Sequence, residues 1–324
     1  SLRRGQHTDD HAIFLMIRRP PRSTRKESSA ASDVYKRQGS HMVKIAHKAG
    51  HDVITLDNLS TGHQDAVLFG EFELCDILDT AKLDKLFKKH TPDAVMHFSA
   101  YSLVGESMVD PYKYYNNNVS GTLSLLKVMI DNDCKKLIFS SSAAIFGNPE
   151  YIPIDESHPK NPINPYGKSK LMVEEILKDF ESAHDLKYVS FRYFNAAGHD
   201  PDGELSERHD PETHLLPIIM QAANGQRDSV SIFGNDYDTN DGTCIRDYIH
   251  VNDLASAHLK GLDYLNQSKL LSAEFNLGNG NGFSVKEVVQ QVKDITGKSF
   301  LVVERGRRGG DPSILVANDK KARK

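Results

Sequence analysis

The chain has 324 residues, of which 39% are hydrophobic and 26% are charged, and its formal net charge at pH 7 is −4. This length suits one large α/β domain or two smaller ones, and the balance of charge speaks against a nucleic-acid-binding or membrane-surface protein. No apolar run approaches the roughly 20 residues that span a bilayer.

The spacing of cysteines and histidines adds two expectations. Cys75, Cys134 and Cys244 are far apart and share no metal-binding or redox spacing, which indicates a reduced, cytoplasmic protein. The histidine pairs spaced four residues apart have no nearby third ligand, so we expect no metal site.

Residues 1–38 differ from the rest of the chain in composition and in hydrophobic periodicity. They are basic, contain many serines and have no sustained period of 2.0 or 3.6 residues, so we interpret them as a non-native or disordered leader. A native extension or a transit peptide are the alternatives, although the acidic residues weaken the latter. The apolar stretch 12–17 could fill a strand position, but no glycine turn follows it and more than about 20 residues separate it from Gly39.

From Gly39 onward, strand and helix patterns alternate, which predicts a doubly wound parallel sheet of the Rossmann-like α/β class. We place this domain at residues 39–195. The expected strands are 52–56, 72–74, 94–98, 136–140 and 188–194. The expected helices are 42–51, 81–90, 118–132 and 166–184.

After Asn195 the chain becomes rich in Gly, Pro and acidic residues and then shows shorter elements, so we assign residues 196–324 to a smaller substrate-binding part. Helices are expected at 215–224, 251–265 and 285–295, and strands at 230–233, 274–277 and 300–303. Residues 317–321 have the pattern of a helix start, which we interpret as a helix cut short at the C-terminus.

The strand at 52–56 and the helix before it form the back half of a βαβ unit. The front half should be a strand that leads into G-x-G-x-x-G, and of that motif only Gly39 is present, in a position suited to the last glycine. Gly39 to Met42 could also be a cloning scar, but the helical pattern that follows favours native residues. Without the other glycines we expect NAD to bind weakly or not at all.

The strongest local motif is Tyr166-x-x-x-Lys170. Residues four apart lie on one face of a helix, and a nearby ammonium stabilises a phenolate, so Tyr166 is a candidate general acid or base. Ser142 lies at the carboxyl end of a predicted parallel strand, where ligands bind in such folds. A Ser–Tyr–Lys set in this order resembles the catalytic group of the short-chain dehydrogenase/reductases.

A longer series of motifs makes the resemblance more specific. The chain is similar to the UDP-glucose 4-epimerase family of extended short-chain dehydrogenase/reductases, in family order from Gly39 onward. The segments that carry this are DNLSTG (57–62), HFSA (97–100), VGES (104–107), YYNNNVSGT (114–122), FSSSAAIFG (139–147), NPYGKSKLMVEE (164–175), RYFNAAG (192–198), SIFGNDYDTNDGT (231–243), IRDYIHVNDLA (245–255) and FNLGNG (275–280).

The resemblance implies two sets of ligand contacts. The NAD contacts it implies are Gly39, Asp57, Asn58, Asp76, Ile77, Phe98, Ser99, Asn117, Tyr166 and Lys170. An acidic side chain at the end of the second strand, here Asp57, favours NAD over NADP because it repels a 2′-phosphate. The implied contacts to the UDP-hexose are Ser142, Asn195, His214, Arg246, Arg308 and Asp311.

The family's reaction interconverts UDP-glucose and UDP-galactose. The resemblance implies that hydride passes from C4 to NAD and returns through a 4-keto intermediate, and that the enzyme is a homodimer. One alternative is another nucleotide-sugar enzyme of the superfamily, such as a 4,6-dehydratase, but Ala143 and Ala144 stand where its acidic pair is needed. The other alternative is a non-catalytic fragment or inactive relative.

Overall fold

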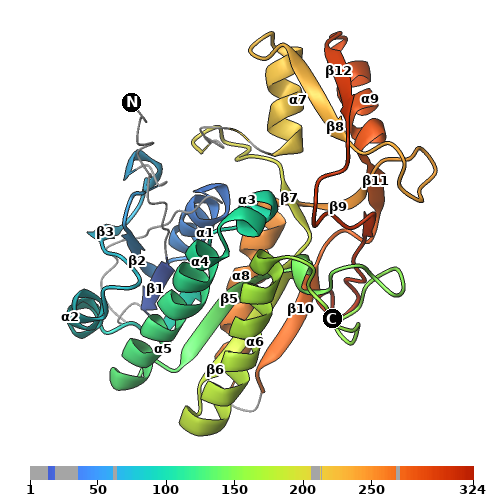
Figure 1. Ribbon diagram of the computed structural model, residues 1–324. Coiled ribbons are helices and arrows are strands. Elements are labelled where there is room, and N and C mark those ends of the chain that lie inside the picture. The colour runs from blue at the N-terminus through green and yellow to red at the C-terminus, as the bar shows by residue number, and fades with distance from the viewer. Residues whose placement is uncertain (1–13, 19–35, 61–63, 206–211, 213, 268–270) are drawn as a thin grey trace, which may run out of the picture.

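The computed structural model describes residues 14–18, 36–60, 64–205, 212, 214–267 and 271–324. Its centre is a seven-stranded sheet of order β10-β6-β5-β4-β1-β2-β3, flanked by helices on both faces (Figure 1). The strands of this sheet are β1 (Phe14–Arg18), β2 (Asp52–Asp57), β3 (Glu71–Leu74), β4 (Ala94–His97), β5 (Lys136–Ser142), β6 (Lys187–Tyr193) and β10 (Ala273–Leu277). The fold is the Rossmann-like α/β class expected from the alternating pattern.

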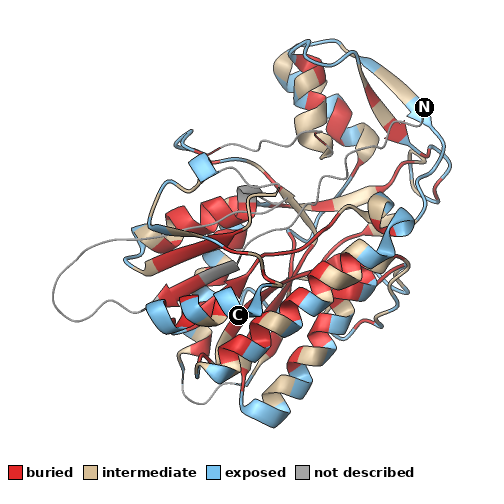
Figure 2. Ribbon diagram, turned by 60° about the vertical axis from the view of Figure 1, so that its left-hand side comes forward, coloured by how far each residue is buried: buried red, intermediate tan, exposed pale blue. Residues whose placement is uncertain are grey.

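Each face of the sheet is covered by its own set of helices. On one face lie α2 (Thr80–His90), α5 (Thr122–Asp131) and α6 (Pro165–His184), whose apolar sides join one buried cluster with β1, β2, β4 and β5. On the other face lie α1 (Lys36–Lys48) and α8 (Val251–Leu265), which contact each other and form a second cluster. The inner sides of these helices are buried and their outer sides exposed (Figure 2).

A smaller lobe stands apart from the sheet, at the upper right of Figure 1. It pairs β8 (Ser229–Phe233) in parallel with β12 (Leu301–Arg305) and packs α7 (Leu215–Ala223) and α9 (Val285–Thr296) around them. Short strands lie between this lobe and the main sheet. They are β7 (Asn195–Ala197), β9 (Ile245–His250), β11 (Gly282–Ser284) and β13 (Ile314–Leu315).

The connections between β4 and α6 contain short helical segments. They are α3 (Val104–Val109), α4 (Pro111–Tyr114), the π-helix η2 (Tyr115–Gly121) and the 3-10 helix η3 (Ala143–Ile145). A further 3-10 turn, η1 (Gln64–Ala66), precedes β3. The helix expected at 118–132 therefore begins as a π-helix, a form often found at functional sites.

Three expectations need correction in detail. Residues 14–18 of the leader form the central strand β1, which runs antiparallel to both β2 and β4, whereas all other neighbouring strands of the sheet pair in parallel. The helix expected from residue 42 begins at Lys36, so residues 36–38 also belong to the fold. The expected helix start at 317–321 is a single turn at 320–323. No helix in the described part of the chain is long and apolar enough to cross a membrane.

Candidate active site

Tyr166 and Lys170 lie one turn apart at the start of α6 and are 6% and 3% exposed. Asn164 caps this helix, because its side-chain oxygen accepts a hydrogen bond from the Gly167 amide at 2.8 Å. A Cβ on Gly167 would lie 2.4 Å from the Ala144 carbonyl oxygen, so only glycine permits this approach. The first turn of α6 is thereby packed against η3, the segment that follows Ser142.

Ser142 is the last residue of β5, and its Oγ accepts a hydrogen bond from the Ala144 amide at 3.2 Å. Its neighbour Ser141 donates to Glu174 Oε1 at 2.7 Å. Arg192 on β6 forms two hydrogen bonds to the Glu174 carboxylate, at 2.9 and 2.8 Å. This buried pair fixes the strand end that presents Ser142 to the helix carrying Tyr166.

Lys170 is held beneath the carboxyl end of the sheet. Its Nζ donates to the Ser140 carbonyl at 2.7 Å and lies 4.8 Å from the centre of the Phe139 ring. Burial, with a smaller contribution from Lys170, lowers the pKa of His97 to about 3. His97 is therefore neutral, and the ammonium of Lys170 is the positive charge in this part of the site.

Tyr166 belongs to a packed group of aromatic side chains. Tyr101, Tyr114 and Tyr166 form one buried cluster, in which the rings of Tyr114 and Tyr166 meet edge-on at 6.5 Å. The Tyr114 hydroxyl lies 2.7 Å from Glu106 Oε2. Burial and this carboxylate raise the pKa of Tyr114, so Tyr114 stays protonated. Of the three tyrosines, Tyr166 is the one with a buried lysine, Lys170, four residues further along the same helix.

The residues expected to contact the adenosine of NAD lie together at the ends of β2 and β3. Asp57 is buried, and its carboxylate accepts the Leu59 amide at 2.6 Å. Asn58 donates to Asp76 Oδ2 at 2.9 Å. Ile77 packs against η2, where a Cβ on Gly121 would lie 2.7 Å from its side chain.

The residues expected near the middle of the cofactor follow β4 and line η2. The Phe98 ring stacks on His258 at 4.9 Å. Ser99 Oγ is buried and has no hydrogen-bond partner among the described residues. Asn117 is buried and donates to Asn118 Oδ1 at 3.0 Å.

Gly39 is not placed in a glycine turn. It lies inside the first turn of α1, where it is buried, and residues 19–35 before the helix contain no glycine. The strand beside β2 and β4 does not lead into this helix in the manner of a dinucleotide-binding turn. The residues expected at the two ends of the NAD site are among the described residues. These residues include no glycine turn before α1 that could hold the pyrophosphate, so the described part of the chain does not fit NAD as a whole.

Three of the expected substrate residues come together on the opposite side of the site. Asp311 lies between two arginines, with Oδ1 at 3.6 Å from Arg246 and Oδ2 at 3.0 Å from Arg308. The Arg246 guanidinium also donates to the carbonyls of Ile245 and Pro312, at 2.9 and 2.8 Å. Arg246 is thus fixed, whereas the side chain of Arg308 is 57% exposed.

The segment that carries Asp311 reaches the catalytic helix. Asn164, the cap of α6, donates to the Gly310 carbonyl at 3.4 Å. Asn195 begins β7 and pairs with Tyr248 on β9, the strand that carries Arg246. His214 lies at the start of α7, where its amide donates to Glu212 at 2.8 Å.

Several residues that position the site were not identified from the sequence. Asn118 bonds both backbone groups of Tyr101 and donates to Ser169 Oγ at 3.0 Å, which ties the loop after β4 to α6. Asp247 is fully buried and accepts three backbone amides, from Asn279, Gly280 and Ala317. Burial nevertheless raises the pKa of Asp247. The adjacency of Asn118 to Asn117 was the available signal.

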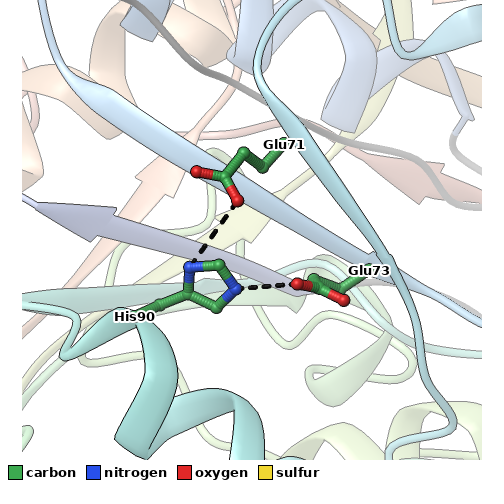
Figure 3. A group of neighbouring side chains, drawn as sticks. All are labelled: Glu71, Glu73 and His90. Carbon is green, nitrogen blue, oxygen red and sulfur yellow. Dashed lines mark hydrogen bonds and ion pairs between the residues drawn. The ribbon is translucent and has the colours of Figure 1, made fainter.

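Two groups of potential metal ligands lie elsewhere among the described residues. In one, His90 Nε2 lies 2.8 Å from Glu73 and Nδ1 lies 4.0 Å from Glu71 (Figure 3). Lys89 also pairs with Glu73, and the group joins the end of α2 to the edge strand β3. In the other, the buried ammonium of Lys44 lies within 2.8 Å of the carboxylates of Asp200, Asp202 and Glu204. Protein cations occupy both groups, and the absence of a metal stays a prediction.

Comparison with known proteins gives a consistent result. The model of the NAD dependent epimerase/dehydratase family matches residues 38–278. The UDP-glucose 4-epimerase of Halalkalibacterium halodurans is 51% identical over 284 residues, which cover 88% of this chain and 85% of that protein.

Solved structures agree with this. The UDP-glucose 4-epimerase of Brucella ovis in complex with NAD has a TM-score of 0.84 at 50% identity, covering 88% of this chain and 87% of that one. The enzyme of Bifidobacterium longum in complex with NAD⁺ and UDP also has a TM-score of 0.84, at 36% identity, with 88% of both chains covered. With this extent of similarity, and with Ser142, Tyr166 and Lys170 at one end of the sheet, the chain belongs to the NAD-dependent epimerase/dehydratase family.

Proposed function

We propose that the site is that of a UDP-glucose 4-epimerase, which interconverts UDP-glucose and UDP-galactose at C4. The observation that carries this proposal is the contact between Asn164 and Gly310. It brings the segment of Arg308 and Asp311 to the first turn of the helix that holds Tyr166. The diphosphate handle and the reacting sugar of one UDP-hexose then have neighbouring binding sites.

The nucleotide part of the substrate is bound by charge and shape. A guanidinium forms paired, charge-assisted hydrogen bonds to phosphate, and Arg246 is held for this by the carbonyls of Ile245 and Pro312. Arg308, Asp311, Asn195 and His214 complete the set that we assign to the UDP-hexose. Binding energy concentrated in the nucleotide leaves the sugar able to present either face to the catalytic group.

The proton chemistry belongs to α6 and β5. Tyr166 removes the proton from the sugar 4-hydroxyl, the Lys170 ammonium stabilises the phenolate, and Ser142 hydrogen-bonds to the same hydroxyl. NAD, when bound, would supply the acceptor for hydride from C4. The nucleotide-sugar half of this chemistry is assigned to Ser142, Tyr166, Arg246 and the residues around them, which all belong to the described part of the chain.

Binding of UDP tests the substrate assignment. We expect Arg246→Ala to raise the Kd for UDP by about 10–100-fold, because a hydrogen bond to a charged group contributes about 1.5–3 kcal/mol. The exposed Arg305→Ala is the matched control and should leave the Kd unchanged. Isothermal titration calorimetry on the full chain measures both. Equal affinities for the wild type and Arg246→Ala would refute the substrate assignment.

We also propose a homodimer, formed through the outer face of η2, α5 and α6. An apolar hollow of about 430 Å³ lies there, lined by Val119, Pro162, Leu171, Met172 and Ile176 among others. Leu123 and Met172 are 40% and 46% exposed, which is unusual for apolar side chains grouped on one face. Light scattering should give a dimer for the wild type and a monomer for Met172→Lys, whereas Met220→Lys, on α7, should stay dimeric.

A further inference from the structure

The central position of the sheet is occupied by a strand that runs in the reverse direction. Strand β1 lies between β2 and β4 and is hydrogen-bonded to both. Figure 1 shows it beside β2. Phe14 pairs with Leu56 and His97, near the carboxyl ends of β2 and β4, and Arg18 pairs with Asp52 at the amino end of β2. The two flanking strands are parallel to the rest of the sheet, so β1 is the exception.

This strand completes the core on both faces. Met16 is fully buried in the cluster beneath α2 and α5, beside Ile54 and Val95. Ile17 is 1% exposed and belongs to the opposite cluster, with Val53 and Ala94. The alternation of neighbouring side chains to the two faces is that of a central strand. Residues 14–18 therefore fill the position as a true strand of the sheet.

The reversed direction separates β1 from the start of α1. Helix α1 ends at Lys48, close before the amino end of β2. A helix of 13 residues is about 20 Å long, so the other end of α1, at Lys36, lies toward the carboxyl ends of the parallel strands. The end of β1 at Arg18 lies on the amino side. Residues 19–35 connect the two, whereas a βα turn takes about two to six residues. No short turn of backbone amides can pass from this strand into the N-terminus of α1 to hold a pyrophosphate.

The nucleotide-sugar side does not depend on β1. Arg246 lies on β9, Asp311 lies just before β13, and Asn164 caps α6. The contacts that join these residues involve Gly310 and Pro312. Strand β1 pairs with β2 and β4 and not with these elements. The reversal of β1 thus leaves these contacts as they are.

We propose that Phe14–Arg18 is a substitute central strand that uncouples the two ligand sites. It restores the core of the sheet in the reverse direction, so the chain keeps its affinity for the UDP part of a nucleotide sugar and loses its affinity for the dinucleotide. This inference rests on the proposed function for the identity of the retained ligand. The proposed physical cause of the lost affinity for the dinucleotide is the direction of β1.

Cross-linking tests the direction of the strand. In the reversed register Ile17 is opposite Val53, whereas a parallel strand with Met16 still opposite Ile54 would place Ile17 opposite Thr55. The pair Ile17→Cys with Val53→Cys should form a disulfide under mild oxidation, and the matched pair Ile17→Cys with Thr55→Cys should not. The native cysteines are buried and common to both proteins. Formation of the second disulfide in place of the first would overturn the proposal.

Binding of NAD tests the consequence. The full chain should bind UDP in calorimetry. It should bind NAD at least about 100-fold more weakly than a variant whose residues 1–38 are replaced by a strand designed to run parallel to β2 and a G-x-G-x-x-G turn that ends at Gly39, because backbone donors to the phosphates are regained. Purified full chain that carries NAD, seen in its absorbance and fluorescence, would overturn the inference while the proposed function stands. Failure of the full chain to bind UDP would instead refute the retained site.

Discussion

The β1 region and the Arg246 region reach their structures by opposite routes. Phe14–Arg18 fills a position between β2 and β4 through backbone pairing and two buried apolar side chains, Met16 and Ile17. Around Arg246, by contrast, specific polar contacts join segments far apart in the sequence, such as Asn164 to Gly310. An apolar strand position accepts a segment of either direction, whereas a set of converging polar groups does not tolerate replacement. The apolar pairing of β1 therefore preserves the fold of the sheet, and the polar contacts around Arg246 preserve a binding site.

The largest effect should come from breaking the buried pair behind the catalytic serine. Glu174 is fully buried, and Arg192 and Ser141 hold its carboxylate. We expect Glu174→Ala to lower the free energy of unfolding by about 3–5 kcal/mol, because it leaves the Arg192 charge buried without its partner. Urea denaturation followed by circular dichroism measures this.

Asp294→Ala, on α9 of the smaller lobe, is the control for that experiment. Asp294 is exposed and accepts a hydrogen bond from Gln290, so its removal should change stability by less than about 0.5 kcal/mol. A similar loss of stability in both variants would show that the buried contacts of Glu174 contribute no more to the free energy of unfolding than an exposed carboxylate does.

A smaller loss is expected in the substitute strand. Met16→Ala removes a fully buried side chain, and we expect a cost of about 2–3 kcal/mol, at the lower end for such truncations because a five-residue strand can shift to close the cavity. Met220→Ala on α7 is the control, since Met220 is 43% exposed. If Met16→Ala proved as stable as the wild type, β1 would not be seated in the sheet under the conditions of the measurement.

The comparison also explains what the sequence could and could not predict. Periodicity predicted α8 at its observed bounds, Val251–Leu265, and β2 from its observed start, because each buries one regular face. Strand β9 was not predicted, since it is held by β7, β11 and β13, which are short and come from distant parts of the chain. The direction of β1 was equally out of reach, because the pattern of an apolar strand is the same read either way.

The same distinction holds within the site. The pairing of Tyr166 with Lys170 follows from helical spacing alone, and the structure places both side chains in the interior at one helix end. The contact of Asn118 with Ser169, 51 residues away, follows from no local pattern. A shared helix face, which is set by local spacing, could therefore be predicted, whereas a contact made across the fold could not.

The smallest effect concerns the pH dependence of stability and two buried histidines, His97 and His258. His97 lies at the end of β4, where it pairs with Phe14 of β1 and is near Lys170, and His258 packs on Phe98. Burial lowers the pKa of His97 to about 3 and that of His258 to about 4. Below the usual value of about 6.5 the unfolded chain gains protons that the folded chain does not, so stability falls as pH falls. Each histidine should contribute about 1.4 kcal/mol per pH unit.

We expect the free energy of unfolding to decrease steadily from pH 6.5 to pH 5, because both histidines gain protons in the unfolded chain over this range. His97→Gln removes one of the two groups, so its mean slope over this range should be smaller than that of the wild type by about 1 kcal/mol per pH unit, because the unfolded histidine is only partly protonated near pH 6.5. Urea denaturation at pH 7, 6 and 5 gives both slopes, and His184→Gln, at the exposed end of α6, is the control. Parallel slopes for wild type and His97→Gln would mean that His97 is protonated in the folded chain. The end of β4 would then be open to water, and the substitute strand would not seal the sheet beside it.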